Sequence, residues 1–321
     1  MKRRHFIALL GGATAWPLAA RAQPSPMKRI GVLVIGNADV PSFLNELREG
    51  LREFGRIEGQ DYTIEFRSAK GQLSRLPELA SELVRLKVDV IVALYTPCAL
   101  AAKEATREIP IFILSGDPVV TGLVESLSRP GANVTGLSQL GAEVHGKCVE
   151  LFRDMLPSAR RIAAIANADD PLFAKTLIEH IRRAGSGTGT EINPVVMVRS
   201  PDELEAAVAT VVKEKADALV YQASLPTKRM VELTLAHRLP AATGVRAFAE
   251  IGGLMSYGAD GPALFRYAAT FVHKIFQGEK PADLPVEQPV KFELVINLKT
   301  AQVLGLAIPP ALLARADDVI E

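Results

Sequence analysis

The stretch of residues 88–118 constrains the fold most, because it holds two apolar runs separated by one segment of helix length. Its first run, 88–94, is rich in β-branched residues, as is typical of a parallel strand covered on both faces. Thr96 and Pro97 follow this run and favour a helix start, as a hydroxyl N-cap and a first helical residue. The second run, 109–114, leads into a polar turn. We therefore predict two parallel strands whose polar ends lie at one edge of a sheet.

Polar residues at the ends of such strands are candidate ligand-binding residues, because ligands of open α/β sheets bind at the carboxyl ends of the strands. The candidates are Asn37, Thr96, Pro97, Ser115, Gly116, Asp117, Asn167, Gln222 and Tyr257. Several precede predicted helix N-termini, which favour an anionic group such as a carboxylate. Each turn taken singly fits a simple helix cap equally well. Taken together, the turns indicate a cleft for a small polar ligand.

Strands and helices alternate along the whole chain in two series of four or five units, the second of which starts with a predicted strand at 161–166. Such alternation predicts an α/β protein with parallel sheets covered by helices on both faces. Because 321 residues exceed a typical single domain, we expect two doubly wound lobes with a cleft between them. A long predicted helix at 263–277 is distant from either series, so we expect the chain to return there to the first lobe.

Residues 1–22 have the three parts of a secretory signal peptide, namely the basic run Lys2-Arg3-Arg4, an apolar stretch over 6–20 and the cleavage pattern Ala20-Arg21-Ala22. The paired arginines are similar to a bacterial twin-arginine signal, and an ordinary signal peptide is the alternative. Cleavage after Ala22 would release the chain into the periplasm. It would remove four of the 37 basic residues and none of the 36 acidic ones, so we expect no nucleic-acid partner.

Residues for catalysis, metal binding or cofactor binding are scarce. The sequence has neither a G-x-S-x-G elbow nor a G-x-x-x-x-G-K-[ST] loop. His145 and Cys148 share a predicted helix face, and we expect a surface histidine beside a core cysteine because no third metal ligand is near. The glycine-rich run 185–189 follows a helix and is expected to be a flexible surface turn. We therefore expect no enzyme, no cofactor and no metal.

Two acidic pairs and two cysteines have simple structural explanations. Asp169-Asp170 fits cap chemistry, and Asp317-Asp318 fits a solvated tail. Cys98 and Cys148 could form a disulfide in an exported chain, but each fits a helix interior, so the sequence leaves their pairing open.

Several long motifs carry a resemblance to a known family. They are 3–23, Tyr95-Thr96-Pro97, Gly116-Asp117-Pro118, RPGANVTGLS (129–138), GGLMSYG (252–258), KPADLPVEQPVKFELVINLKTAQVLGL (280–306) and IPPALLARADDVIE (308–321). With them, nearly the whole chain resembles the substrate-binding proteins of ABC transporters related to tryptophan and tyrosine binders. The resemblance implies the type I periplasmic-binding-protein fold, with three chain crossings near Gly136, Tyr257 and Pro281. The first lobe would comprise 27–136 and 258–280, and the second 137–257 and 281–321.

The resemblance also implies a function. An exported binding protein of this kind closes its lobes on a small solute, like a Venus flytrap, and passes it to an ABC permease in the inner membrane. Thr96-Pro97 and Gly116-Asp117 match the family's first-lobe ligand turns, and Asn167 and Gln222 occupy the second-lobe turns. The turn 221–226 has no acid to pair with an α-ammonium group. The solute therefore stays open between an amino-acid-like or aromatic compound and an organic acid.

Two other functions stay open beside this one, and a monomer is expected throughout. A periplasmic sensor would bind the same solute and dock on a receptor instead of a permease. An enzyme on the same α/β framework is less favoured, because the sequence shows no nucleophile–base pair and a fold alone is no guide to function.

Overall fold

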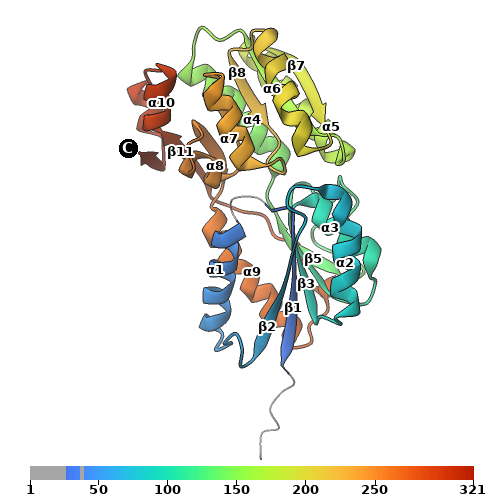
Figure 1. Ribbon diagram of the computed structural model, residues 1–321. Helices are drawn as coiled ribbons and strands as arrows, with labels where there is room; N and C mark the ends of the chain where they lie inside the picture. The colour runs from blue at the N-terminus through green and yellow to red at the C-terminus, as the bar shows by residue number, and fades with distance from the viewer. Residues whose placement is uncertain (1–26, 37–39) are drawn as a thin grey trace, which may run out of the picture.

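The computed structural model describes residues 27–36 and 40–321, which form two α/β lobes (Figure 1). The first lobe is built on a five-stranded sheet in the order β2-β1-β3-β4-β5, in which all neighbouring strands are parallel. Its strands are β1 (Lys28–Val34), β2 (Tyr62–Ser68), β3 (Val90–Leu94), β4 (Ile111–Ser115) and β5 (Val134–Ser138). Helices α1 (Val40–Glu53) and α9 (Gly261–Phe276) cover one face, and α2 (Leu76–Arg85) and α3 (Thr96–Ala105) the other (Figure 1).

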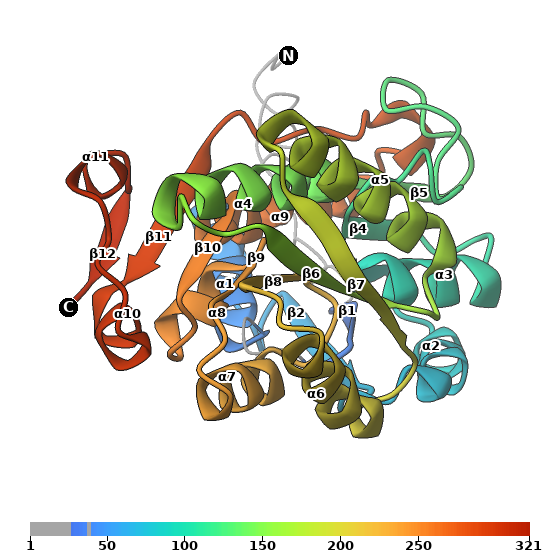
Figure 2. The ribbon, with the colours of Figure 1, turned by 90° about the horizontal axis from the view of Figure 1, so that it is seen from above.

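The second lobe is built on a seven-stranded sheet in the order β12-β11-β10-β9-β8-β6-β7, in which only the β10–β11 pair is antiparallel. Its strands are β6 (Arg161–Asn167), β7 (Glu191–Val198), β8 (Ala218–Tyr221), β9 (Ala241–Thr243), β10 (Met255–Ala259), β11 (Phe292–Asn297) and β12 (Asp318–Ile320). Its helices are α4 (Gly141–Met155), α5 (Pro171–Thr188), α6 (Leu204–Lys213), α7 (Thr227–Ala236), α8 (Arg246–Glu250), α10 (Leu298–Leu304) and α11 (Pro310–Leu313). Figure 2 shows α4 and α5 on one face of this sheet and α6 and α7 on the other. The predicted α/β class with two parallel-dominated sheets is confirmed.

The central strands of the first sheet follow from their composition. Every residue of β3 and β4 is buried, because helices cover both faces of the sheet. β2 lies at the edge and keeps only Tyr62 fully buried. Ile64 is half-buried and Phe66 is exposed, so the burial of this edge strand does not follow its alternating sequence.

We place a crossing between two consecutive elements of the chain when the first packs into the core of one lobe and the next into the core of the other. β5 belongs to the first sheet and α4 to a core of the second lobe, so the first crossing lies between 138 and 141. β10 belongs to the second sheet, whereas α9 packs beside α1 in the first core, so the second crossing lies between 259 and 261.

The third crossing lies later than the sequence predicted. Leu284 and Val286 are buried in the first core, and the Val286 N–H donates to the Leu127 carbonyl at 2.7 Å. Glu287 then pairs with the edge strand β5 through Leu137. The placement near Pro281 is therefore corrected: the apolar residues after Pro281 hold the chain on the first lobe until after Glu287.

Two further expectations are wrong. The glycine-rich run is the last turn of α5, because Gly185 is buried against Thr190 and Ile192, and Gly189 ends the helix with a left-handed φ of 67°. The acidic pair near the C-terminus is not a solvated tail. The Asp317 carboxylate accepts from the Leu294 N–H at 2.8 Å, and Asp318 begins β12.

Candidate functional site

Two adjoining hollows occupy the boundary between the lobes. The first, which we call the Asp170 hollow, is lined by residues of both lobes. Its polar lining includes Thr96 after β3, Asp170 before α5, and Gln222 and Ser224 after β8. The Asp170 hollow therefore offers polar groups from both lobes to a small solute.

The second hollow, which we call the Phe265 hollow, extends the first toward the start of α9. It shares Tyr95, Gln139 and Val245 with the Asp170 hollow. Pro262 and Phe265 give it an apolar wall. The shared residues join the two hollows into one elongated cleft.

An aromatic ring of the second lobe is seated on glycines at the lobe boundary. A Cβ atom added at Gly116 would lie 2.4 Å from the Phe173 ring, and one added at Gly141 would lie 2.8 Å from it. Real Cβ atoms do not approach so closely, so both positions require glycine for the ring to pack there. Gly116 was a sequence-based candidate, but Phe173 was missed, because nothing in an amphipathic helix marks one apolar residue as an inter-lobe contact.

Asp170 combines a structural role with an unsatisfied oxygen. It is only 2% exposed, and its Oδ1 accepts from the Phe173 N–H at 3.4 Å as the N-cap of α5. Its Oδ2 is buried without a hydrogen-bond partner among the residues that the structure describes. Burial, and then the charge of Asp117, raise the pKa of Asp170 to about 6. The cap interpretation was correct for one oxygen, and the other remains available to a group in the hollow.

The second-lobe turns hold one another in place. The Gln222 Oε1 accepts from the Asn167 N–H at 2.8 Å, and the Asn167 Nδ2 donates to the Ser224 Oγ at 3.4 Å. The Asn167 Oδ1 also accepts from the Asp169 N–H at 2.9 Å. Gln222 and Ser224 line the Asp170 hollow, whereas Asn167 lies behind them and fixes the turn.

His145 is buried, which corrects the expectation of a surface histidine. Its Nδ1 lies 2.5 Å from the Gly141 carbonyl oxygen and its Nε2 3.0 Å from the Tyr221 carbonyl oxygen. Burial lowers the pKa of His145, which favours the neutral ring. Because a neutral imidazole has one N–H, it donates to one of these two carbonyls.

Asp117 and Ser115 lie at the end of β4 but line neither hollow. Ser115 is fully buried, and both the Ser115 Oγ and the Asp117 Oδ2 have no hydrogen-bond partner in the described part of the chain. Burial and the nearby Glu143 raise the pKa of Asp117, while the N–H of Ala142 at the start of α4 opposes this shift. Asp117 therefore faces the first turn of a second-lobe helix.

Tyr95 has a backbone conformation that side chains rarely adopt. Its φ is 69° and its ψ is 154°, between β3 and α3, and it borders both hollows. Strain of this kind, worth about 1–3 kcal/mol, is often found at functional sites. Tyr95 was not among the predicted site residues, because no local pattern signals a non-glycine residue in this region.

The remaining predicted site residues lie elsewhere. Pro97 borders a separate surface groove beside Asp169. The Tyr257 ring stacks on Phe292 at a centroid distance of 6.0 Å and lines neither hollow. Asn37 lies outside the residues that the structure describes, as does the predicted leader 1–22.

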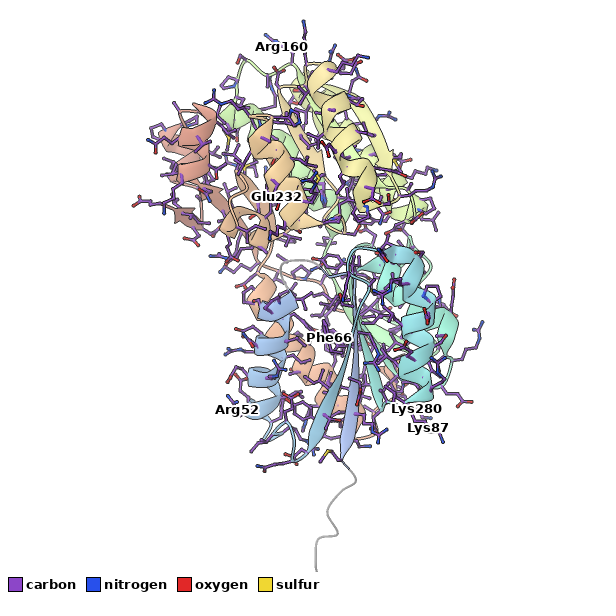
Figure 3. All side chains as sticks on the ribbon, in the orientation of Figure 1. Arg52, Phe66, Lys87, Arg160, Glu232 and Lys280 are labelled. Carbon is purple, nitrogen blue, oxygen red and sulfur yellow. The ribbon has the colours of Figure 1, made fainter. Side chains whose placement is uncertain are left out.

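Few ionisable groups reach the cleft. Asp170 and the buried His145 line the Asp170 hollow, and Arg246 and Glu250 line the Phe265 hollow. Arg246 forms ion pairs with Glu250, Glu293 and Asp318. In Figure 3 Arg160 and Lys280 lie near opposite ends of the molecule, away from the lobe boundary.

The two cysteines do not form a disulfide. Cys98 is buried in the core of the first lobe and Cys148 in that of the second, and both are free thiols. Burial raises the pKa of Cys148 to about 12, so it is protonated and inert at neutral pH. Over 27–36 and 40–321, no group of three His, Cys, Asp or Glu side chains could hold a metal ion. No helix of the same ranges has the length and apolarity to cross a membrane.

Comparisons with known proteins agree with this architecture. A family model described as ABC transporter substrate binding protein matches residues 30–320. The tyrosine-binding protein of Clostridioides difficile (strain R20291) is 27% identical over 270 residues, which cover 80% of this chain and 75% of that protein. The structure of an ABC domain from Streptococcus pneumonia in complex with L-Trp is 28% identical, with a TM-score of 0.83 and coverage of 92% of this chain and 100% of the other. A conserved domain protein from Vibrio cholerae is 27% identical, with the same TM-score and coverage. The chain therefore belongs to the family of ABC transporter substrate-binding proteins and has the type I periplasmic-binding-protein fold.

Proposed function

We propose that this protein is the exported solute-binding component of an ABC importer, and that its solute is an α-amino acid with an apolar or aromatic side chain. One observation carries the choice of solute: Asp170 presents a buried carboxylate oxygen without a partner, among the described residues, at the wall of the cleft. A buried anion of this kind is stabilised by a bound cation such as an ammonium group. The relatives named for tyrosine and crystallised with L-Trp support the same class.

Asp170 removes the sequence-based objection to an amino acid. The turn 221–226 lacks an acid, but Asp170 borders the same hollow as Gln222 from a different turn. The α-ammonium group would bind Asp170, and Gln222 and Ser224 would offer neutral polar contacts. The α-carboxylate would face the first turn of α3, where Thr96 lines the hollow and the helix N-terminus favours an anion.

The Phe265 hollow would accept the side chain. Tyr95, Pro262 and Phe265 give it an apolar side, against which aromatic rings pack well. Arg246 and Glu250 line another part of the same hollow. Binding between the lobes would stabilise their closed arrangement, and the closed protein would then deliver the solute to the permease. We infer a periplasmic monomer that begins at Gln23 and has no catalytic role. A sensor function would use the same cleft and differ only in the docking partner.

Direct titration tests the proposal. Trp16 is the only tryptophan of the sequence and lies in the predicted leader, so a chain beginning at Gln23 has none and contains every described residue. The fluorescence of added L-tryptophan, excited at wavelengths where tyrosine does not absorb, can then be followed without tryptophan emission from the protein. Calorimetry extends the panel to tyrosine, phenylalanine, leucine and aromatic organic acids. Binding of an amino acid that is lost in Gln222→Ala supports the cleft assignment. Binding of organic acids alone would contradict the amino-acid assignment.

A further inference from the structure

Two carboxylates lie on opposite sides of the lobe boundary. Asp117 follows β4 of the first lobe, and Asp170 precedes α5 of the second. Gly116, next to Asp117, contacts the ring of Phe173, whose N–H donates to Asp170. Each carboxylate has a buried oxygen without a hydrogen-bond partner among the described residues, and the two groups interact electrostatically. The lobe boundary therefore brings two acids together.

The surroundings do little to neutralise this pair. Glu143, in the first turn of α4, adds a third negative charge near Asp117. The N–H of Ala142 and, more weakly, His180 of α5 favour the ionised form of Asp117, whereas burial favours the neutral ring of His145. Neither Asp117 nor Asp170 forms an ion pair with a lysine or arginine within 27–36 and 40–321. Arg246 of the Phe265 hollow is held by its own three acids.

We propose that Asp117 is a specificity-determining residue, which acts with Asp170 to require a positive charge in the closed cleft and so excludes neutral or anionic solutes of the same shape. Because Asp117 lines neither hollow, it acts through its charge on Asp170 and on the solute. This inference rests on the proposed function and adds a selection rule to it: an amine binds, and the same molecule without its amine does not.

The same pair couples binding to a proton. Without a cation, burial and then the charge of Asp117 favour protonation of Asp170. An arriving ammonium group displaces that proton. The proton passes from the carboxyl oxygen to solvent, the ammonium group pairs with the resulting carboxylate, and no covalent bond between heavy atoms changes. Affinity for an amine should therefore rise as pH increases through about 6, the pKa of Asp170, and level off above it.

The test compares L-tryptophan with indole-3-propionate, and L-tyrosine with its counterpart that lacks the amine. Affinities are measured by calorimetry from pH 5 to pH 8 on the wild type, on Asp117→Asn, and on Asp169→Asn as a control for the loss of one exposed carboxylate. The amide oxygen introduced by Asp117→Asn can still accept from the Ala142 N–H. We expect Asp117→Asn to reduce the preference for the amine severalfold and to move the rise in affinity to lower pH, because the substitution removes one of the charges that raise the pKa of Asp170. The control should change neither quantity.

Proton release is measured on the wild type itself, so the test does not depend on the folding of a variant. Calorimetry of L-tryptophan binding in buffers of different ionisation enthalpy should show a proton released near pH 5.5 and none at pH 8. If an amine and its deaminated counterpart bind equally, or if binding releases no proton at pH 5.5, the selection rule is wrong and the proposed function survives. If no amino acid binds at all, the proposed function itself fails, and the inference with it.

Discussion

Replacing Asp170 with asparagine should make the empty protein more stable and ligand binding weaker. The pKa of Asp170 is raised from 3.8 to about 6, because the folded protein buries its charge. A shift of about two units corresponds to roughly 3 kcal/mol, at 1.36 kcal/mol for each unit. Asp170 is almost completely buried, so solvent screening does not reduce this value much. Asparagine cannot ionise, and it can still cap α5 by accepting from the Phe173 N–H.

The sign follows from proton linkage. The folded state binds the Asp170 proton more tightly than the unfolded state, so this group lowers stability as pH rises from about 4 to about 6. At pH 7.5 the wild type carries the full penalty, whereas at pH 3.5 both states are largely protonated and the penalty is almost absent. We therefore expect Asp170→Asn to gain up to about 3 kcal/mol at pH 7.5 and almost nothing at pH 3.5.

Urea unfolding followed by far-ultraviolet circular dichroism measures both values, with Asp169→Asn as the control for an exposed neighbour. The same Asp170→Asn protein should lose about 10- to 150-fold in affinity for an amine ligand, because a charged hydrogen bond contributes about 1.5–3 kcal/mol. A variant that is less stable at pH 7.5, or equally changed at both pH values, would show that the buried oxygen of Asp170 is satisfied in the wild type. Asp170 would then not be an ammonium site.

Three further substitutions test the packing. Gly116→Ala should displace the Phe173 ring and weaken ligand binding at least severalfold. Adding Phe173→Leu to this variant should restore part of the lost affinity. If Gly116→Ala leaves the calorimetric affinity unchanged, the contact between the lobes does not contribute to binding. Gly185→Ala should lower the free energy of urea unfolding by about 1–3 kcal/mol, because its Cβ would lie 2.7 Å from the Thr190 carbonyl oxygen. The control Gly187→Ala has open space around its Cβ and should be neutral or stabilising. Equal effects of the two substitutions would favour a flexible turn over a helix end. Leu284→Ala should lower the free energy of unfolding by about 2–5 kcal/mol, because it truncates a side chain of the first core. If it lowers that free energy no more than a substitution at an exposed site does, residues 284–286 are not part of the first core.

The sequence determined the local architecture because its signals are local. Unbroken apolar runs predicted the fully buried strands β3 and β4. The predicted start of α3 needs a correction of one residue, because Tyr95 is its N-cap, Thr96 is its first helical residue, and no side chain caps it. Parallel strands all end at one edge, so the polar residues that follow them could be chosen as candidates from the sequence alone. Thr96, Gly116 and Gln222 do border the Asp170 hollow.

Only the tertiary structure decided which of these residues share one site. Whether Asp170 is merely a cap or also a wall of the cleft depends on how the second lobe faces the first, and no short-range pattern encodes that. The same is true of Phe173, whose position against Gly116 joins residues far apart in the chain. Leu284 and Val286 show the reason most clearly: an apolar residue signals that it will be buried, but the partner that buries it is chosen by the packing of the whole chain.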